Sequence, residues 1–204
     1  MIKDKFGARL DHVVHALFPF LFWRPLNPNL LSLFGAVVSV GAASAFLAGH
    51  LRTGGWLMIA AGFCDLVDGA VARHNHTTST FGAFLDSTLD RLVDMAVLAG
   101  MIMFYAAHGA PGIALVAGVA LVSSVLVSYA KARAEVVMGH LEGGLFERGE
   151  RMGILSFGAV TGFLPVALAV VAVGATITAL QRIAIAHRAM AKIDAERVSE
   201  GQAQ

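Results

Sequence analysis

The sequence predicts an all-α integral membrane protein, in which six transmembrane helices follow an amphipathic juxtamembrane helix. Three observations support this fold class. Of the 204 residues, 57% are hydrophobic and only 14% are charged, and the mean hydropathy is +0.71. Soluble domains carry about 25% charged residues. Several apolar stretches approach the roughly 20 residues with which a helix crosses a bilayer, and they fill most of the chain.

The first element, over residues 1–24, is predicted to be an amphipathic helix that lies on the membrane surface. Its hydrophobic residues recur at helical spacing and are Phe6, Leu10, Val13, Val14, Leu17 and Leu21. Lys3, Lys5 and Arg9 fall largely on the opposite face, which is typical of interfacial helices. Two aspartates interrupt the segment and no small-residue cleavage site follows it, so the pattern does not indicate a cleaved signal peptide.

Six membrane spans are expected after this helix. Pro25 and Pro28 end the first helix, because proline breaks helical hydrogen bonding. The predicted spans cover about residues 30–48, 56–73, 81–107, 113–138, 151–163 and 165–187. Turns are expected at 49–55 and 109–112, and the longest connection is 139–150. The predicted organisation is therefore a juxtamembrane helix at 1–24, a six-helix domain at 25–189 and a polar C-terminal tail at 190–204.

The basic residues predict the orientation in the membrane. With six spans, both chain ends and the second and fourth connections share one side. That side receives Lys3, Lys5, Arg9, Arg24, Arg73, Lys131, Arg133, Arg148, Arg151, Arg182, Arg188, Lys192 and Arg197. The opposite loops receive only Arg52, so the positive-inside rule places the basic side in the cytoplasm and the protein in the cell (inner) membrane.

Several site types are not indicated by the composition. The net charge of +1 does not indicate the strongly basic surface with which proteins bind nucleic acid. Cys64 is the only cysteine, so no intramolecular disulfide can form, and we expect it to be a small buried hydrophobic residue. No Cys or His spacing matches a zinc site.

Aspartates interrupt the second and third predicted spans. Asp65 and Asp68 lie three residues apart near the cytoplasmic part of the second span, whereas Asp86, Asp90 and Asp94 lie four apart on one face of the third. One charge at the bilayer centre costs roughly 2.5–3.5 kcal/mol on insertion scales, so several together would cost about 10 kcal/mol. The cluster is therefore expected to bind a multivalent cation close to the polar interface.

The ligands available in this cluster are all carboxylate oxygens, which favour magnesium, manganese or calcium over zinc. Two aspartates from each of two neighbouring helices could hold two ions, an arrangement suited to clamping phosphate oxygens and stabilising a leaving group. Gly69 and Gly82 flank the cluster and would let helices or a nucleotide approach the backbone closely. Arg73 is placed to meet a phosphate.

These residues also carry a resemblance to a known family. The chain reads Asp65-Leu-Val-Asp68-Gly69-Ala-Val-Ala72-Arg73, then eight residues, then Gly82-Ala-Phe-Leu-Asp86-Ser-Thr-Leu-Asp90. This resembles the signature of the CDP-alcohol phosphatidyltransferases, DxxDGxxAR…GxxxDxxxD, at every fixed position. The resemblance extends to Pro28-Asn29 before the first span and to the six-helix plan, so it covers most of the chain.

The resemblance implies a reaction and a set of site residues. Asp65, Asp68, Asp86 and Asp90 would bind two divalent ions, usually Mg²⁺ or Mn²⁺, and Asp90 would also be the general base. The CDP-lipid would be bound by Pro28, Asn29, Leu30, Leu31, Gly69, Ala72, Arg73, Ser79 and Gly82. The acceptor hydroxyl would attack the β-phosphorus of CDP-diacylglycerol and CMP would leave, with the acyl chains in a groove open to the bilayer. A homodimer is also expected from the family.

One aspartate of the third span, Asp94, lies outside the signature. We expect it to pair with Arg91 or with another buried basic residue. A purely structural role and a role in the site are both open for this carboxylate at the level of sequence.

Basic residues near the cytoplasmic ends of the later spans predict an acceptor site. Lys131, Arg133, Arg148, Arg151 and Arg182 could together form a pocket beside the metals. Positive-inside anchoring and surface ion pairs would also explain each of them singly. A basic pocket suits an acceptor that carries phosphate, since cations bind the phosphate and orient the hydroxyl.

Inositol phosphate and glycerol 3-phosphate are the two phosphorylated acceptors to consider within the family. Residues 86–91, the segments KARAE at 131–135 and ERGER at 147–151, and Gln181-Arg182 resemble prokaryotic phosphatidylinositol-phosphate synthases. The DPxADK sequence that is typical of the glycerol-phosphate enzymes is absent from the third span. The resemblance therefore favours inositol phosphate, and phosphatidylglycerol-phosphate synthesis is the alternative.

Three other classes of protein fit these residues less well. A divalent-cation transporter would also place aspartates inside a membrane, but the Gly-Ala-Arg positions between the acidic pairs would then have no evident purpose. A membrane prenyltransferase also binds pyrophosphate through magnesium, but usually has more spans than this chain can supply. A scaffold would not need four aspartates that face one another.

Overall fold

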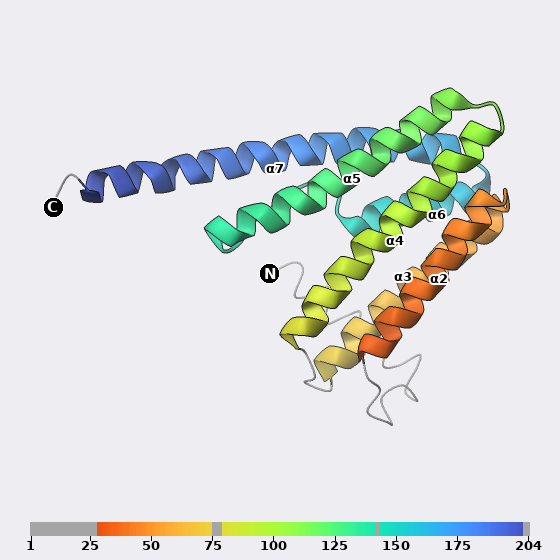
Figure 1. The fold of residues 1–204 in the computed structure, drawn as a ribbon, viewed down its shortest axis with the longest axis horizontal. Helices are drawn as coiled ribbons and strands as arrows, with labels where there is room; N and C mark the ends of the chain where they lie inside the picture. Colours follow the sequence, from red (N-terminus) through yellow and green to blue (C-terminus); the bar gives the residue numbers. More distant parts are fainter. Residues whose placement is uncertain (1–27, 75–78, 142, 202–204) are drawn as a thin grey trace.

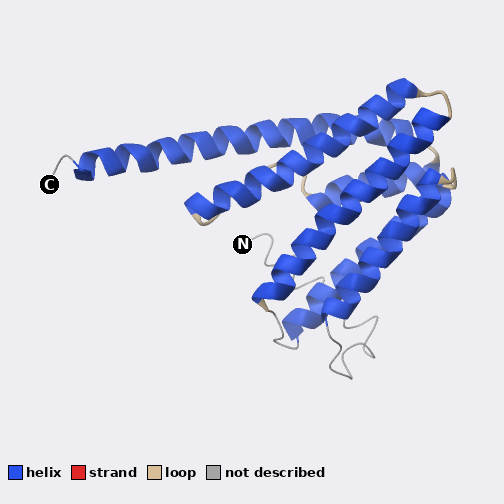
Figure 2. Cartoon of the chain, viewed as in Figure 1, coloured by secondary structure: helices blue, strands red, loops and turns tan. Residues whose placement is uncertain are grey.

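The structure, a computed structural model, describes residues 28–74, 79–141 and 143–201, and the side chains of 30–67, 79–141 and 143–195. The described part is all helical and contains no strand (Figure 2). In chain order the helices are α2 (Pro28–Leu47), α3 (Leu51–His74), α4 (Thr80–Ala107), α5 (Pro111–Met138), α6 (Arg148–Thr161) and α7 (Leu164–Gly201). The amphipathic helix expected at 1–24 lies outside the described residues.

The six helices form a closed ring. Helix α2 packs against both α3 and α4, α4 packs against α5, and α5 packs against α7. Helix α6 closes the ring, because it packs against α3 on one side and against α7 on the other. Figure 1 shows the turns α2–α3, α4–α5 and α6–α7 at one end of the bundle. The cytoplasmic ends predicted from the sequence therefore all lie at the opposite end.

Local sequence explains where the helices begin and end. Pro111 begins α5, where the missing N–H is tolerated, directly after a turn in which Gly109 has a φ of +71°. Helix α6 begins with a capping box: the side chain of Glu147 caps the backbone of Glu150, and the side chain of Glu150 accepts from the backbone N–H of Glu147. Helix α6 ends at Thr161 and is capped by Gly162, whose left-handed backbone favours glycine.

Two sequence-based expectations about helix boundaries were wrong. The turn expected at 49–55 spans only residues 48–50, because α3 already begins at Leu51. Gly54 and Gly55 lie inside α3 and serve close packing: a Cβ on Gly54 would meet the Phe46 ring at 2.8 Å, and one on Gly55 would meet Ala159 at 2.9 Å. The segment 190–204, expected to be a tail beyond the last helix, continues α7 as far as Gly201.

The interior of the ring is filled by apolar side chains. Phe46, Met101, Leu155 and Leu168 are fully buried, and small residues lie where helices approach one another most closely. Gly100 of α4 is one such position, since a Cβ there would lie 2.5 Å from the carbonyl oxygen of Ala43 in α2. Close backbone approach of this kind is typical of helix pairs in membranes.

Large apolar side chains also cover the outside of the bundle. On α2, α5 and α7 the exposed ones include Leu30, Leu33, Phe34, Val37, Leu115, Val119, Val122, Val166, Val170, Val173 and Ile177. Water-soluble monomers rarely expose apolar surface on this scale. Within the part of the chain that the structure describes, three stretches are long and apolar enough to cross a membrane, namely Leu30–Leu47, Pro111–Met138 and Leu164–Ala195. Helices α3 and α4 carry the aspartates and α6 has only 14 residues, so the crossing of all six helices stays a prediction.

Gly100→Ala should lower the thermal stability of the purified protein, because overpacking costs typically about 1–3 kcal/mol and the Ala43 carbonyl cannot move away cheaply. The melting temperature in detergent measures the effect. Gly118→Ala in α5 is the matched control, since a Cβ there would meet no atom within 4 Å. Equal melting temperatures for the two variants would contradict this account of the α2–α4 contact.

Candidate active site

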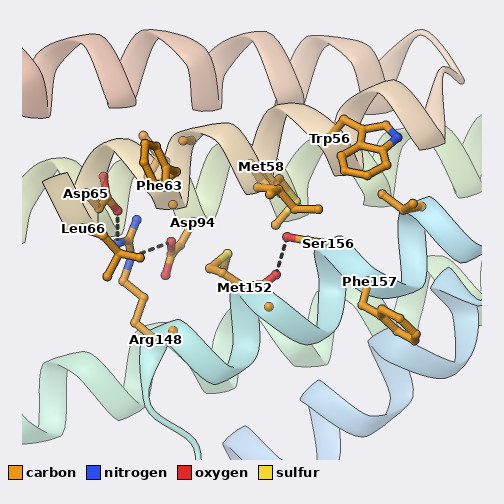
Figure 3. Close-up of a pocket in the computed structure, with 18 of the residues that line it drawn as sticks. Trp56, Met58, Phe63, Asp65, Leu66, Asp94, Arg148, Met152, Ser156 and Phe157 are labelled. Atoms are coloured by element: carbon orange, nitrogen blue, oxygen red, sulfur yellow. Dashed lines mark hydrogen bonds and ion pairs between the residues drawn. The ribbon is translucent and has the colours of Figure 1, made fainter. Parts of the chain in front are cut away.

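The guanidinium group of Arg148 lies among three aspartates at the predicted cytoplasmic end of the ring. Its Nη1 is 2.6 Å from Oδ2 of Asp65 in α3 and 2.9 Å from Oδ1 of Asp90 in α4. Its Nε donates to Oδ1 of Asp94 at 3.1 Å. Figure 3 shows Arg148 reaching from α6 between Asp65 and Asp94. One cation thus joins carboxylates from two other helices.

Two of the predicted metal ligands converge on a single point in this arrangement. Asp65 and Asp90 both contact Nη1 of Arg148, so a positively charged group already lies where their carboxylates meet. Asp86 is exposed one turn before Asp90 and interacts electrostatically with Asp65 and Arg148. These donors are all hard oxygens, and they fit a hard divalent cation.

The described aspartates do not by themselves complete a metal site. Among the described residues, no three His, Cys, Asp or Glu side chains lie close enough together to hold an ion as they stand. Asp68, the fourth ligand of the predicted set, has its side chain outside the described residues. The remaining carboxylates surround the guanidinium group of Arg148 and do not point to a shared metal position.

Several residues predicted to bind the CDP-lipid have no described side chain. Gly69, Ala72 and Arg73 belong to the last turns of α3, and Pro28 and Asn29 begin α2, but only their helical backbone is described. The other members of this set have described side chains. Leu30 is exposed and Leu31 is half-buried in the first turn of α2.

Ser79 has a local role that the sequence analysis missed. It is the N-cap of α4, and its hydroxyl accepts a hydrogen bond from the backbone N–H of Gly82 at 2.9 Å. A serine just before a predicted span is a recognisable cap signal. The cap fixes the start of the helix that carries Asp86, Asp90 and Asp94.

The loop before α6 is fixed by α7, and this sets the position of Arg148. The backbone N–H of Phe146 donates to Oγ1 of Thr178 at 3.1 Å. Gly144 has a φ of +123°, and a Cβ there would meet Thr178 at 2.8 Å. Nη1 of Arg151 in turn donates to the carbonyl of Phe146 at 3.0 Å. The first turn of α6 therefore begins at a defined point on the inner face of α7.

Four of the five predicted acceptor residues line one cavity of about 240 Å³, which we call the polar pocket. They are Lys131, Arg148, Arg151 and Arg182, and Asp90 lines the same cavity. The fifth residue, Arg133, is exposed and does not line the polar pocket, because it lies two positions after Lys131 and faces another way. The structure therefore brings together four of the five predicted residues at this cavity and leaves Arg133 outside it.

Arg182 also holds helices together. Its Nη1 donates to the carbonyl of Val127 at 2.8 Å and its Nε donates to the carbonyl of Gly143 at 3.1 Å. The side chain is buried, and these bonds tie α7 to α5 and to the loop before α6. Part of its hydrogen-bonding capacity is thus used by the backbone around the polar pocket.

Asp94 pairs with basic residues of α6 and not with Arg91. Besides its bond to Arg148, its Oδ2 lies 3.8 Å from Nη2 of Arg151. Arg91 donates to the carbonyl of Ser87, one turn earlier on the same helix. The sequence left open whether Asp94 pairs with Arg91 or with another buried basic residue. The structure shows the second of these arrangements.

A second cavity, of about 750 Å³, lies between α3, α4 and α6, and we call it the apolar groove. Met58, Met152 and Phe157 are among its walls. In Figure 3, Asp65 and Arg148 lie at one end of the groove and Trp56 lies at the other. An elongated ligand with an apolar body and a charged head would match this distribution.

Comparison with known proteins decides which family this site belongs to. The sequence pattern of the CDP-alcohol phosphatidyltransferases matches residues 26–193. The chain is a member of this family. The expectation drawn from the aspartate signature is thereby confirmed, and the protein is a CDP-alcohol phosphatidyltransferase.

Characterised relatives narrow the comparison. A phosphatidylinositol phosphate synthase of Streptomyces avermitilis is 36% identical, over 100% of this chain and 90% of that protein. An archaetidylinositol phosphate synthase of Methanothermobacter thermautotrophicus is 40% identical, over 68% of this chain and 69% of that protein.

Solved structures show the same architecture. The phosphatidylinositol phosphate synthase of Mycobacterium tuberculosis with CDP-DAG bound has a TM-score of 0.75 and 31% identity, covering 87% of this chain and 92% of that chain. The same enzyme in complex with manganese and citrate has a TM-score of 0.74 and 30% identity, covering 88% of each chain.

Gly35→Ala should lower transferase activity by about tenfold, because even small displacements in an active site are costly. A Cβ on Gly35 would lie 3.2 Å from Oδ1 of Asp65, so the carboxylate would have to shift. Initial rates at saturating substrate measure the effect. Gly41→Ala, on the same helix, is the control, since a Cβ there would meet only Leu57, at 3.9 Å. Equal activity in both variants would contradict a role for Gly35 in placing Asp65.

Proposed function

We propose that this enzyme transfers the phosphatidyl group of CDP-diacylglycerol to a hydroxyl of inositol phosphate and releases CMP. The observation that carries the proposal is the juxtaposition of Asp90 with Lys131, Arg148, Arg151 and Arg182 around one polar pocket. Guanidinium and ammonium groups bind phosphate through charge-assisted hydrogen bonds. A phosphorylated acceptor bound there would present its hydroxyl beside the expected base.

The relatives support inositol phosphate as the acceptor. The similar proteins from Streptomyces and Mycobacterium are phosphatidylinositol phosphate synthases, and the archaeal relative is an archaetidylinositol phosphate synthase. Their shared acceptor chemistry agrees with the residues that favoured inositol phosphate over glycerol 3-phosphate in the sequence.

We further propose that Asp65, Asp68, Asp86 and Asp90 hold two divalent ions, Mg²⁺ or Mn²⁺. The convergence of Asp65 and Asp90 on one cationic nitrogen and the manganese complex of the Mycobacterium enzyme support this assignment. When bound, such ions supply Lewis-acid stabilisation of the charge that develops on the phosphate oxygens and on the leaving CMP.

The side chains of the protein would remove the proton of the acceptor hydroxyl and bind the acceptor phosphate. The acceptor hydroxyl oxygen forms a bond to the β-phosphorus, and the bond from this phosphorus to the oxygen of CMP breaks. Asp90 takes the proton of the hydroxyl, for which its place on the wall of the polar pocket is suitable. Lys131 and the arginines hold the acceptor phosphate, so that the hydroxyl is oriented before it reacts.

The CDP-lipid is proposed to enter from the other side of the aspartates. The apolar groove would receive acyl chain, since its walls are largely hydrophobic and its charged end lies at Asp65 and Arg148. Pro28, Asn29, Leu30, Leu31, Gly69, Ala72, Arg73, Ser79 and Gly82 would bind the nucleotide part. The two substrates would then meet at the cluster that separates the two cavities.

The membrane arrangement proposed from the sequence fits this chemistry. Helices α2 to α7 would all cross the bilayer as one domain over 25–189, with the active site facing the cytoplasm across the inner membrane. The apolar outer surface and the position of the basic pocket at one end of the ring support this topology. Pairing into a homodimer is proposed from family membership alone.

Purified protein given CDP-diacylglycerol and Mn²⁺ should release CMP with inositol phosphate, and about tenfold or more slowly with glycerol 3-phosphate, serine or free inositol, because these lack the matching phosphate or ring. Liquid chromatography of CMP measures each rate. Chelation of divalent ions should abolish release. Faster turnover with glycerol 3-phosphate would instead assign phosphatidylglycerol-phosphate synthesis, and cation flux without CMP release would indicate a transporter.

Asp90→Asn should reduce CMP release by about 10²- to 10⁴-fold, the usual contribution of a general base. The variant should remain folded and should still bind CDP-diacylglycerol, as measured by protection against thermal unfolding. Asp194→Asn, an exposed aspartate on the far part of α7, is the matched control and should keep full activity. Undiminished turnover in Asp90→Asn would rule out the general-base assignment.

A further inference from the structure

We propose that Asp94, which lies outside the aspartate signature, is a positioning residue for the acceptor site. Its carboxylate holds Arg148 and Arg151 at the polar pocket and thereby sets the affinity for a phosphorylated acceptor. The inference rests on the proposed function, because it explains how the arginines of that same pocket are held in place.

Asp94 is the most buried carboxylate of the cluster among those whose side chains the structure describes. Its side chain is 10% exposed, against 27% for Asp90, one turn earlier on α4. Each of its oxygens faces a different arginine from the first turn of α6: Oδ1 accepts from Arg148 at 3.1 Å, and Oδ2 lies 3.8 Å from Nη2 of Arg151. A buried carboxylate is unfavourable unless cations compensate its charge. The Asp94 carboxylate and the two arginines therefore stabilise one another.

Arg148 makes two kinds of contact, which would respond differently when divalent ions bind the aspartates. Its Nη1 contacts Asp65 and Asp90, which are proposed metal ligands, whereas its Nε contacts Asp94. When cations bind Asp65 and Asp90, Asp94 is the contact that Arg148 keeps. Arg148 lines both the polar pocket and the apolar groove, so this anchor holds the guanidinium at the boundary where the two substrates meet.

Arg151 retains hydrogen-bonding capacity next to the same carboxylate. Its side chain is 1% exposed, and Nη1 is used by the carbonyl of Phe146. Its Nε and Nη2 are buried and have no hydrogen-bond partner among the described residues. Buried donors without partners are unfavourable. Asp94 attracts this guanidinium by charge from 3.8 Å without consuming those donors, which leaves them for an anion in the polar pocket.

Asp94→Asn tests the proposal, since it keeps the shape of the side chain and removes its charge. It should raise the KM for inositol phosphate by about tenfold or more, in line with the loss of oriented charge-assisted contacts. The KM for CDP-diacylglycerol and the kcat at saturating acceptor should change less than about threefold. Asp94→Glu, which retains the charge, should recover most of the acceptor affinity.

Met101→Ala is the control for lost stability, because Met101 is fully buried in the core of α4 and contacts neither cavity. It should lower the melting temperature and leave the acceptor KM unchanged. Titration of the metal-free protein with Mn²⁺, followed by electron paramagnetic resonance, gives a second readout, and Asp94→Asn should bind the ion as the wild type does.

Three results would overturn the proposal. Loss of Mn²⁺ binding in Asp94→Asn would make Asp94 a metal ligand. A parallel decline of kcat and both KM values with the melting temperature, as in a destabilised core variant, would make its role purely structural. An acceptor KM in Asp94→Glu as high as in Asp94→Asn would show that charge is not what matters. Failure of the proposed function is separate, since the wild type would then release no CMP with inositol phosphate.

Discussion

The positive charge of Arg148 makes the acidic centre of this protein possible. Asp65, Asp90 and Asp94 would otherwise repel one another. Breaking a buried ion pair typically costs about 3–5 kcal/mol, and the largely buried Asp94 comes nearest to this case. The arginine also fastens α6 to α3 and α4. Divalent ions bound to Asp65 and Asp90 would take over from the guanidinium the compensation of these two carboxylates, and Arg148 would keep its contact with Asp94.

The closed ring of helices explains how a small chain builds two cavities around one cluster. Helix α3 supplies Asp65 and α4 supplies Asp90 and Asp94, while the basic residues come from α5, α6 and α7. Helix α2 contributes through the lack of a side chain at Gly35, which leaves room for the Asp65 carboxylate. The apolar groove and the polar pocket share Asp94 and Arg148 as lining residues, so the two cavities meet at the charged cluster.

The sequence predicted the parts of this site that depend on helical periodicity. The spacing of Asp86, Asp90 and Asp94 places them on one face, and the signature predicted the family. Periodicity could not predict that Arg148 reaches three carboxylates, because that position depends on the loop before α6 and on its contacts with Thr178, 32 residues after Phe146.

Errors in the sequence-based analysis have similar physical causes. Gly54 and Gly55 suggested a turn by composition, but their small size is used for packing against other helices, which only the fold reveals. The polar stretch after residue 189 suggested a tail, although helix formation needs no apolar face once a long helix is already nucleated. Arg133 was grouped with its neighbours by charge, but the polar pocket is lined by Lys131, two residues earlier on the same helix, and not by Arg133.

The length of α7 has a consequence for how the protein can be handled. A helix of 38 residues is about 57 Å long, well beyond the roughly 30 Å of a hydrocarbon core. Arg182 lies at the polar pocket, and the helix continues from there to Gly201 over roughly 28 Å. Figure 1 shows this part extending past the end of α5. A fluorescent domain joined after it would be carried clear of both cavities and could report the membrane side without obstructing the substrates.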